Sequence, residues 1–195
     1  MRLIKYTFIC LLFINVVFAG EWHVKKDPHN LVKFISTTTL LDFEGTTNNI
    51  DGYIYWEGDE LFAGKNELYF EVELNTLKTG IGKRDRDMRE DVLETHKWPI
   101  TYFKGSFKQV EKKENTDHYS VELKGIMFIH GVEKEMIIPG EIKIEGEVMS
   151  VESKYSIFLK DFEIEAPSLL AFIKVAEEIK LEIKFNMEQY RKKDK

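Results

Sequence analysis

The chain contains almost no cysteine: among its 195 residues, Cys10 is the only one. It lies in an N-terminal apolar segment that we expect to be removed, and the mature chain would then form no disulfide and no thiolate metal site. The five histidines show no paired spacing that would set two imidazole rings on one strand face or helix turn. The sequence therefore predicts no metal site.

Basic residues are also too few for a protein that binds nucleic acid. The whole chain has 28 Lys and Arg against 34 Asp and Glu, and loss of Arg2 and Lys5 with the N-terminal segment would leave a net charge near −8. A surface that binds phosphate backbones needs an excess of basic charge. The sequence therefore predicts no nucleic-acid partner.

Signatures of catalysis are absent as well. The sequence has no GxSxG motif, no Walker loop and no pair of acids in a catalytic context, so we predict no catalytic residues and a protein that is not an enzyme. The charged run at 84–87 fits either an anion clamp or the ion-paired start of a helix. We favour the second reading, because surface charge pairs are common and weak.

The N-terminus has the features of a secretory signal. Arg2 and Lys5 precede an apolar run that ends in the small residues Ala19 and Gly20, which predicts cleavage after residue 19. A membrane anchor fits less well, because a span needs roughly 20 apolar residues and Asn15 interrupts a shorter run. We therefore expect a signal peptide at 1–19 and a mature domain at 20–195, periplasmic or secreted and without a transmembrane segment.

What the chain does have is a period of two. Apolar and polar residues alternate strictly at 67–74 and 178–188, and more weakly at 31–41, 52–57, 100–108, 118–129, 134–144 and 148–159. This pattern is typical of strands with one face in a core and one in water. Turn residues at short intervals, among them 45–52 and 130–134, favour antiparallel pairing. The sequence predicts one all-β domain, an antiparallel barrel of about eight strands.

Two segments break this rhythm. At 84–95, Met88 and Val92 recur at helical spacing among charged residues, which predicts a short helix with these two side chains turned inward. Trp98 and Pro99 would then restart the sheet. A second short helix or loop is expected at 167–172, because proline suits a first helical turn. Such pieces usually lie across an open end of a barrel.

The order of several motifs resembles the YceI-like family. The motifs include a Thr-Gly turn before an Arg-Asp pair and a short helix, an aromatic-proline step, and a His-Gly-Val hairpin. The residues that carry them are Thr79, Gly80, Arg84, Asp85, Met88, Trp98, Pro99 and Phe103, with segments 28–34, 43–45, 52–56 and 125–134. One departure is Glu163, which stands where glycine is common in the family. The resemblance implies a lipocalin-like barrel that binds a long isoprenoid chain in its lumen.

Strand parity selects the residues that would line this lumen. An eight-stranded barrel is either filled by side chains or holds one small ligand, and the residues alone leave both outcomes open. With the resemblance, we expect an exported protein that binds an isoprenoid or quinone-like lipid for transport or storage, without another cofactor. The expected lipid contacts are Phe34, Phe43, Ile54, Trp56, Phe70, Val72, Phe103, Met127, Ile129, Ile183 and Phe185, with head-group contacts from Arg84, Tyr102 and His130.

An alternative from another class is a non-enzymatic interaction or scaffold protein of the cell envelope. In this reading the barrel is filled, and outward aromatics contact a partner or a second copy, as in a homodimer. The aromatics with outward parity are Tyr53, Tyr55, Tyr69, Tyr102 and Phe128. A cavity of several hundred Å³ would distinguish the two readings.

Overall fold

The structure is a computed structural model that describes residues 19–38, 42–58, 62, 64–114, 116–170 and 173–190. The predicted signal peptide therefore lies outside the described residues, apart from Ala19 in the first strand. No helix in these ranges is long and apolar enough to cross a membrane.

Strands dominate the described ranges, and their pairing is antiparallel throughout. The strands are β1 (Ala19–Val24), β2 (Leu31–Thr38), β3 (Asp42–Thr47), β4 (Ile50–Glu57), β5 (Asn66–Glu73), β6 (Ile100–Lys112), β7 (His118–Ile129), β8 (Val132–Glu145), β9 (Val148–Phe158), β10 (Ser168–Leu170) and β11 (Ile173–Gln189). The helical pieces are the short helix α1 (Gly82–Asp87), a π-helical turn η2 (Met88–Val92) and the 3-10 turns η1 (Leu74–Thr76) and η3 (Leu159–Phe162).

The sheet closes into a barrel, as predicted. From β4 to β9 each strand pairs with the next strand of the barrel, β9 pairs with β11, and β11 returns to β1. The long strand β11 pairs with β1 near one end and with β2 along the rest, so β1 and β2 together fill one strand position. Asn30 lies between them, where its side-chain Nδ2 donates to the Lys25 carbonyl and its Oδ1 accepts from the Asn186 amide.

Two expectations about local structure were wrong. Residues 45–52 were expected to form a turn, but residues 42–47 form β3, because Gly45 has no side chain and lets the Phe34 ring of β2 pack against the backbone. The second helix expected at 167–172 is also not found. Residues 168–170 form β10, which pairs with β11 in a hairpin, and residues 171–172 lie outside the described ranges.

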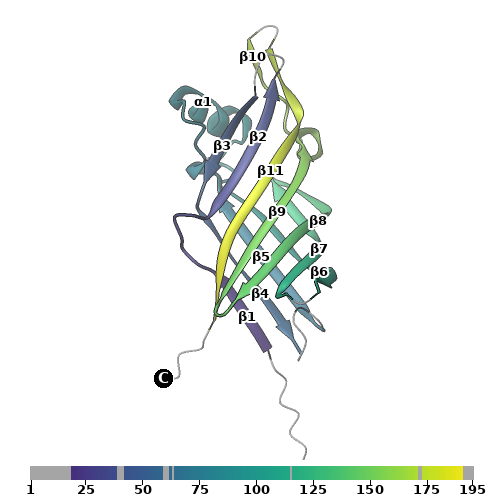
Figure 1. The fold of residues 1–195 in the computed structure, drawn as a ribbon. Helices are drawn as coiled ribbons and strands as arrows, with labels where there is room; N and C mark the ends of the chain where they lie inside the picture. The colour runs from purple at the N-terminus through teal and green to yellow at the C-terminus, as the bar shows by residue number, and fades with distance from the viewer. Residues whose placement is uncertain are drawn as a thin grey trace, which may run out of the picture.

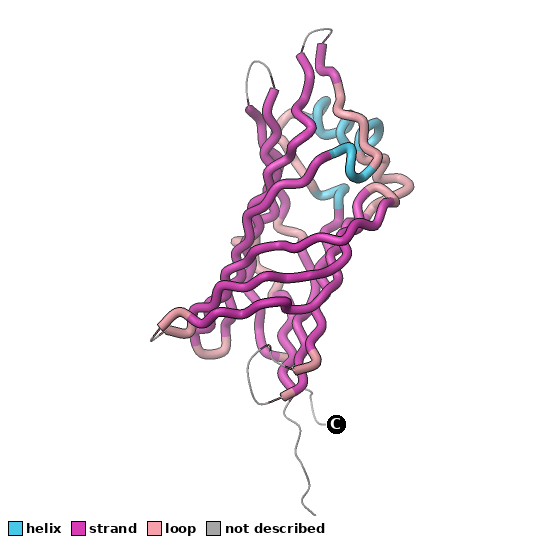
Figure 2. The backbone as a smooth tube through the Cα atoms, turned by 90° about the vertical axis from the view of Figure 1, so that its right-hand side faces the viewer, coloured by secondary structure: helices cyan, strands magenta, loops and turns pink. Residues whose placement is uncertain are grey.

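The segment at 79–105, which interrupts the alternating strands, has the short helix and the following strand start that the sequence predicted. It contains α1 and η2, and β6 begins directly after Trp98 and Pro99. The helical pieces gather at one end of the barrel, beside β3 and near β10, while β1 and the end of β11 lie at the opposite end (Figures 1 and 2). An isolated bridge between Thr46 and Lys78 connects β3 to the residue just before this segment. We call residues 74–95 the lid.

Positive φ angles occur at two places that the family resemblance singled out, the β7–β8 hairpin and the end of η3. His130 and Gly131 form the two-residue turn between β7 and β8, with φ of 52° and 83°, a conformation typical of hairpin turns. Glu163 ends η3 with a φ of 55°. A glycine, which is common at this position in the family, would adopt this left-handed conformation without steric cost. This chain forms the same turn with a glutamate.

Candidate functional site

The lower half of the barrel, toward the ends of β1 and β11, is solid. Ile54, Leu68, Met149 and Met187 are at most 1% exposed and lie in one layer of inward residues. Phe62, which comes from the connection between β4 and β5, adds an aromatic plug. Its ring centre lies 5.2 Å from that of Trp56, 4.5 Å from that of Phe107 and 5.8 Å from that of Tyr119.

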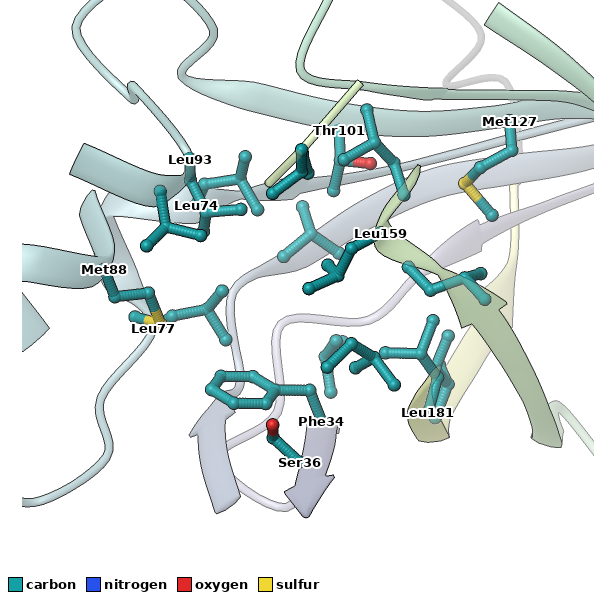
Figure 3. Close-up of a pocket in the computed structure, with 18 of the residues that line it drawn as sticks. Phe34, Ser36, Leu74, Leu77, Met88, Leu93, Thr101, Met127, Leu159 and Leu181 are labelled. Carbon is teal, nitrogen blue, oxygen red and sulfur yellow. The ribbon is translucent and has the colours of Figure 1, made fainter. Parts of the chain in front are cut away.

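The upper half encloses a cavity of about 730 Å³. Its floor includes Phe70 and Phe185, whose ring centres are 5.0 Å apart. Inward residues of the strands form the walls, and Leu74, Leu77, Met88 and Leu93 of the lid lie over one side (Figure 3). The lining is mainly apolar, and its volume falls in the range of pockets that hold small-molecule ligands, about 300–1,000 Å³.

Most residues predicted from strand parity line this cavity. The structure places there Phe34, Phe43, Phe70, Val72, Phe103, Met127, Ile129, Ile183 and Phe185. Ile54 and Trp56 also face inward, but they belong to the solid lower half and lie outside the cavity. Met88 and Val92 of the lid line the cavity, as expected from their helical spacing.

The three expected head-group residues are not brought together. Arg84 lines the cavity at the lid, whereas Tyr102 contributes to the lining beside Phe103 but donates its hydroxyl hydrogen bond outward, to Glu133 at 2.6 Å. His130 lies outside the cavity. Its Nε2 is 3.1 Å from the Glu94 carboxylate and its Nδ1 is 3.4 Å from the Phe162 carbonyl oxygen, so it connects the hairpin to the lid and to η3.

Thr79 organises the lid. Its backbone amide and its hydroxyl both donate to Asp85 Oδ1, and Arg84 donates from Nε to the Thr79 hydroxyl at 2.8 Å and from Nη2 to the Thr79 carbonyl at 2.9 Å. The guanidinium carbon of Arg84 also lies 4.6 Å from the centre of the Phe43 ring. The Thr-Gly and Arg-Asp motif therefore holds the lid against β3, which favours the ion-paired reading of the run at 84–87.

This arrangement predicts a pH-dependent contribution to stability. Hydrogen bonds from Thr79, with the positive charges of Arg89 and Arg84, hold the pKa of Asp85 below its usual value of 3.8. The carboxylate therefore stabilises the fold above pH 3.8, and this contribution is lost as the pH falls through the lower folded-state pKa. We expect Asp85→Ala to cost about 1.5–3 kcal/mol of unfolding free energy at pH 7.

Urea unfolding of Asp85→Ala and of the parent protein between pH 7 and pH 2 would measure this difference. It should shrink below pH 3.8 and not above it. Asp51→Ala is a control, since Asp51 is an exposed strand carboxylate that accepts a hydrogen bond from the neighbouring Gly52 amide. A constant difference for Asp85→Ala across the whole range would contradict the assignment.

On the outer wall, aromatic side chains with outward parity lie in a stacked row that runs from Tyr53 to Phe128. Ring centres are 6.2 Å apart for Tyr53 and Tyr69, 5.7 Å for Tyr69 and Tyr102, and 4.8 Å for Tyr102 and Phe128. Hydrogen bonding to Glu67 raises the pKa of Tyr53 to about 12. The homodimer expected on this face stays a prediction, which sedimentation of the purified protein would test.

Comparison with known proteins identifies the family. A model of the YceI-like domain matches residues 22–187, which is most of the chain. The chain belongs to the YceI-like family. A search of curated proteins found no match. The predicted resemblance is thereby confirmed, and nearly the whole barrel with its lid falls within the YceI-like domain, which leaves out only the start of β1 and the end of β11.

Solved structures share the fold of this YceI-like barrel at low sequence identity. Burkholderia cenocepacia BcnA has a TM-score of 0.64 at 12% identity, over 80% of this chain and 95% of that one. A polyisoprenoid binding domain from Saccharophagus degradans, implicated in plant cell wall breakdown, has a TM-score of 0.64 at 13% identity, over 87% and 98%. The Campylobacter jejuni YCEI protein has a TM-score of 0.55 at 19% identity, over 76% and 85%.

Proposed function

We propose that this YceI-like protein binds one long apolar lipid, an isoprenoid or a similar chain, in the cavity of its barrel. The observation that carries the proposal is the apolar cavity of about 730 Å³, closed below by packed side chains. Burial of the lipid chain there would be favourable by about 0.8 kcal/mol for each methylene group removed from water. Family membership and the named binding of the Saccharophagus degradans domain add support.

The proposal is binding without chemical turnover. The charged groups at the lid serve the fold: Arg84 is engaged by Thr79, and Lys83 pairs with Asp87. In the described residues, no three His, Cys, Asp or Glu side chains gather as metal ligands. The apolar N-terminal segment supports export, so the protein would carry or store its lipid in the periplasm or outside the cell.

The filled-barrel alternative fits less well. It required side chains to occupy the whole interior, and only the lower half meets that condition. The outer aromatics are compatible with a partner, but the tyrosine hydroxyls of Tyr53, Tyr69 and Tyr102 already donate to glutamate carboxylates. Lipid binding is therefore the better supported function.

The size of the cavity predicts a limit on chain length. At about 30 Å³ for each heavy atom, a cavity of 730 Å³ holds roughly 24 heavy atoms, or about four to five isoprene units. We expect affinity to rise at least about 10-fold from farnesol to geranylgeraniol, because each added methylene is buried. It should rise little from geranylgeraniol to solanesol, whose extra units would remain outside.

Competition against a bound fluorescent lipid would measure these affinities, and mass spectrometry of an organic extract of the purified protein would identify any lipid it carries. Failure of all three alcohols to compete, with an empty extract, would overturn the proposed function. A steady rise from geranylgeraniol to solanesol would instead contradict the size limit alone.

A further inference from the structure

One buried polar group of the barrel has no partner. Ser36 on β2 is 1% exposed, and its Oγ makes no hydrogen bond. The other buried polar residues of the described ranges, Asn30, Thr47, Asp85 and Thr95, all have hydrogen-bond partners. A buried hydroxyl without a partner costs about 1–3 kcal/mol, so its presence requires an explanation.

The Ser36 hydroxyl faces the cavity. Ser36 lines the cavity next to Phe34, and its oxygen points toward the side of the cavity where Phe34 and, beyond it, Leu77 of the lid lie (Figure 3). A ligand in the cavity is therefore the group that this hydroxyl can reach. The position is close to the lid and far from the floor at Phe185.

A second cavity hydroxyl, that of Tyr155 on β9, is also free. Tyr155 lines the cavity, and its hydroxyl has no hydrogen-bond partner among the described residues. By contrast, Tyr53, Tyr55, Tyr69 and Tyr102 on the outer wall each donate to a glutamate. Burial alone raises the pKa of Tyr155, whose side chain is half-buried and lines the cavity. The surface it exposes thus faces the cavity and not bulk water.

The strand register places the two hydroxyl residues on one wall. Ile179 of β11 pairs with Ser36 on one side, and Leu181 of β11 pairs with Tyr155 on the other. Ser36 and Tyr155 are thus two strands apart, roughly 9.6 Å across the sheet, and offset by two residues along it. Because a hydrogen bond joins heavy atoms only about 3 Å apart, each hydroxyl can meet a different point of a ligand that lies along this wall.

The charged residues that line the cavity, Lys83, Arg84, Asp87 and Asp91, all belong to the lid, where Lys83 pairs with Asp87 and Arg84 donates to Thr79. The strand wall around Ser36 and Tyr155 carries no charge that would suit an anion. The inward neighbours on β2, β9 and β11 are apolar, apart from Ser153, whose hydroxyl already donates to the Pro139 carbonyl at 2.6 Å. An unpaired carboxylate or phosphate at this depth would lose far more solvation than two hydroxyl donors return. An uncharged oxygen that accepts a hydrogen bond fits the wall.

Resting on the proposed lipid binding, we propose that the ligand carries an uncharged oxygen near one end, such as a carbonyl, which accepts a hydrogen bond from Ser36, and that Tyr155 offers a second donor further down the same wall. The carbonyl end lies beneath the lid and the apolar chain runs down toward Phe70 and Phe185. The cavity thereby selects among lipids of equal chain length, and it holds them in one orientation.

Two matched probes test this proposal: hexadecane and 2-hexadecanone, which differ by one carbonyl oxygen. We expect the full protein to prefer the ketone by about fivefold, since one net hydrogen bond contributes about that much. The double variant Ser36→Ala, Tyr155→Phe should lose the preference. Its melting temperature should not fall, because both changes remove unpaired polar atoms.

A control variant with the same two kinds of substitution, Ser156→Ala with Tyr69→Phe, changes residues that face outward on β9 and β5 and should keep the fivefold preference. Equal affinity of the parent protein for both probes overturns this inference and leaves the proposed function standing. Equal loss of preference in the control variant also overturns it. Failure to bind either probe overturns the proposed function and the inference with it.

Discussion

Replacing Leu181 and Ile183 together by tryptophan is expected to weaken the binding of geranylgeraniol by about 100-fold while the barrel stays folded. Both residues line the cavity from the middle of β11 and are only partly buried, because they border open space. The two larger rings would displace about four methylene groups of the lipid, at about 0.8 kcal/mol each. Competition binding would measure the loss.

Stability distinguishes this outcome from misfolding. Filling an open cavity commonly stabilises a protein, so the melting temperature of the double variant should stay equal or rise. The control is Lys184→Trp, which places the same ring on the same strand but on the outer face, where Lys184 pairs with Glu152. Unchanged affinity in the folded double variant would place the lipid outside the cavity and contradict the proposed function.

The strict alternation in the sequence was enough to predict the barrel. Its period of two fixes which residues face inward, and β5, β7 and β11 follow it closely. The strand β3 was missed because its glycine and threonines are typical of a turn. Its strand form depends on the Phe34 ring of the neighbouring strand, which covers Gly45. That contact is tertiary and leaves no local signal.

The cavity could be predicted only in part. Strand parity shows whether a side chain faces the barrel interior, but it does not show how far along the barrel axis that side chain lies. Phe70 and Trp56 both face inward, yet one borders the cavity and the other is packed in the solid half. What separates them is Phe62, a residue of a connection with no periodic pattern. Likewise, Ser36 and Tyr155 looked like ordinary strand residues, and only the absence of partners marks them.

Replacing Phe62 by alanine tests whether the two halves have separate roles. Phe62 is 2% exposed and its ring contacts three other aromatic rings. Loss of a buried phenylalanine side chain typically costs about 3–5 kcal/mol of unfolding free energy. Urea unfolding should show this loss, while the affinity for geranylgeraniol should change less than about twofold, because Phe62 lies outside the cavity lining.

Phe158→Ala makes the same chemical change at a position that is 43% exposed on β9, and it should cost below about 1 kcal/mol. A hollow upper half leaves few contacts to stabilise the barrel there, so the plug around Phe62 has to supply them. Comparable losses of stability and of lipid affinity in Phe62→Ala would show that the halves are coupled. A small loss of stability would show that the lid and the cavity walls hold the barrel without the plug.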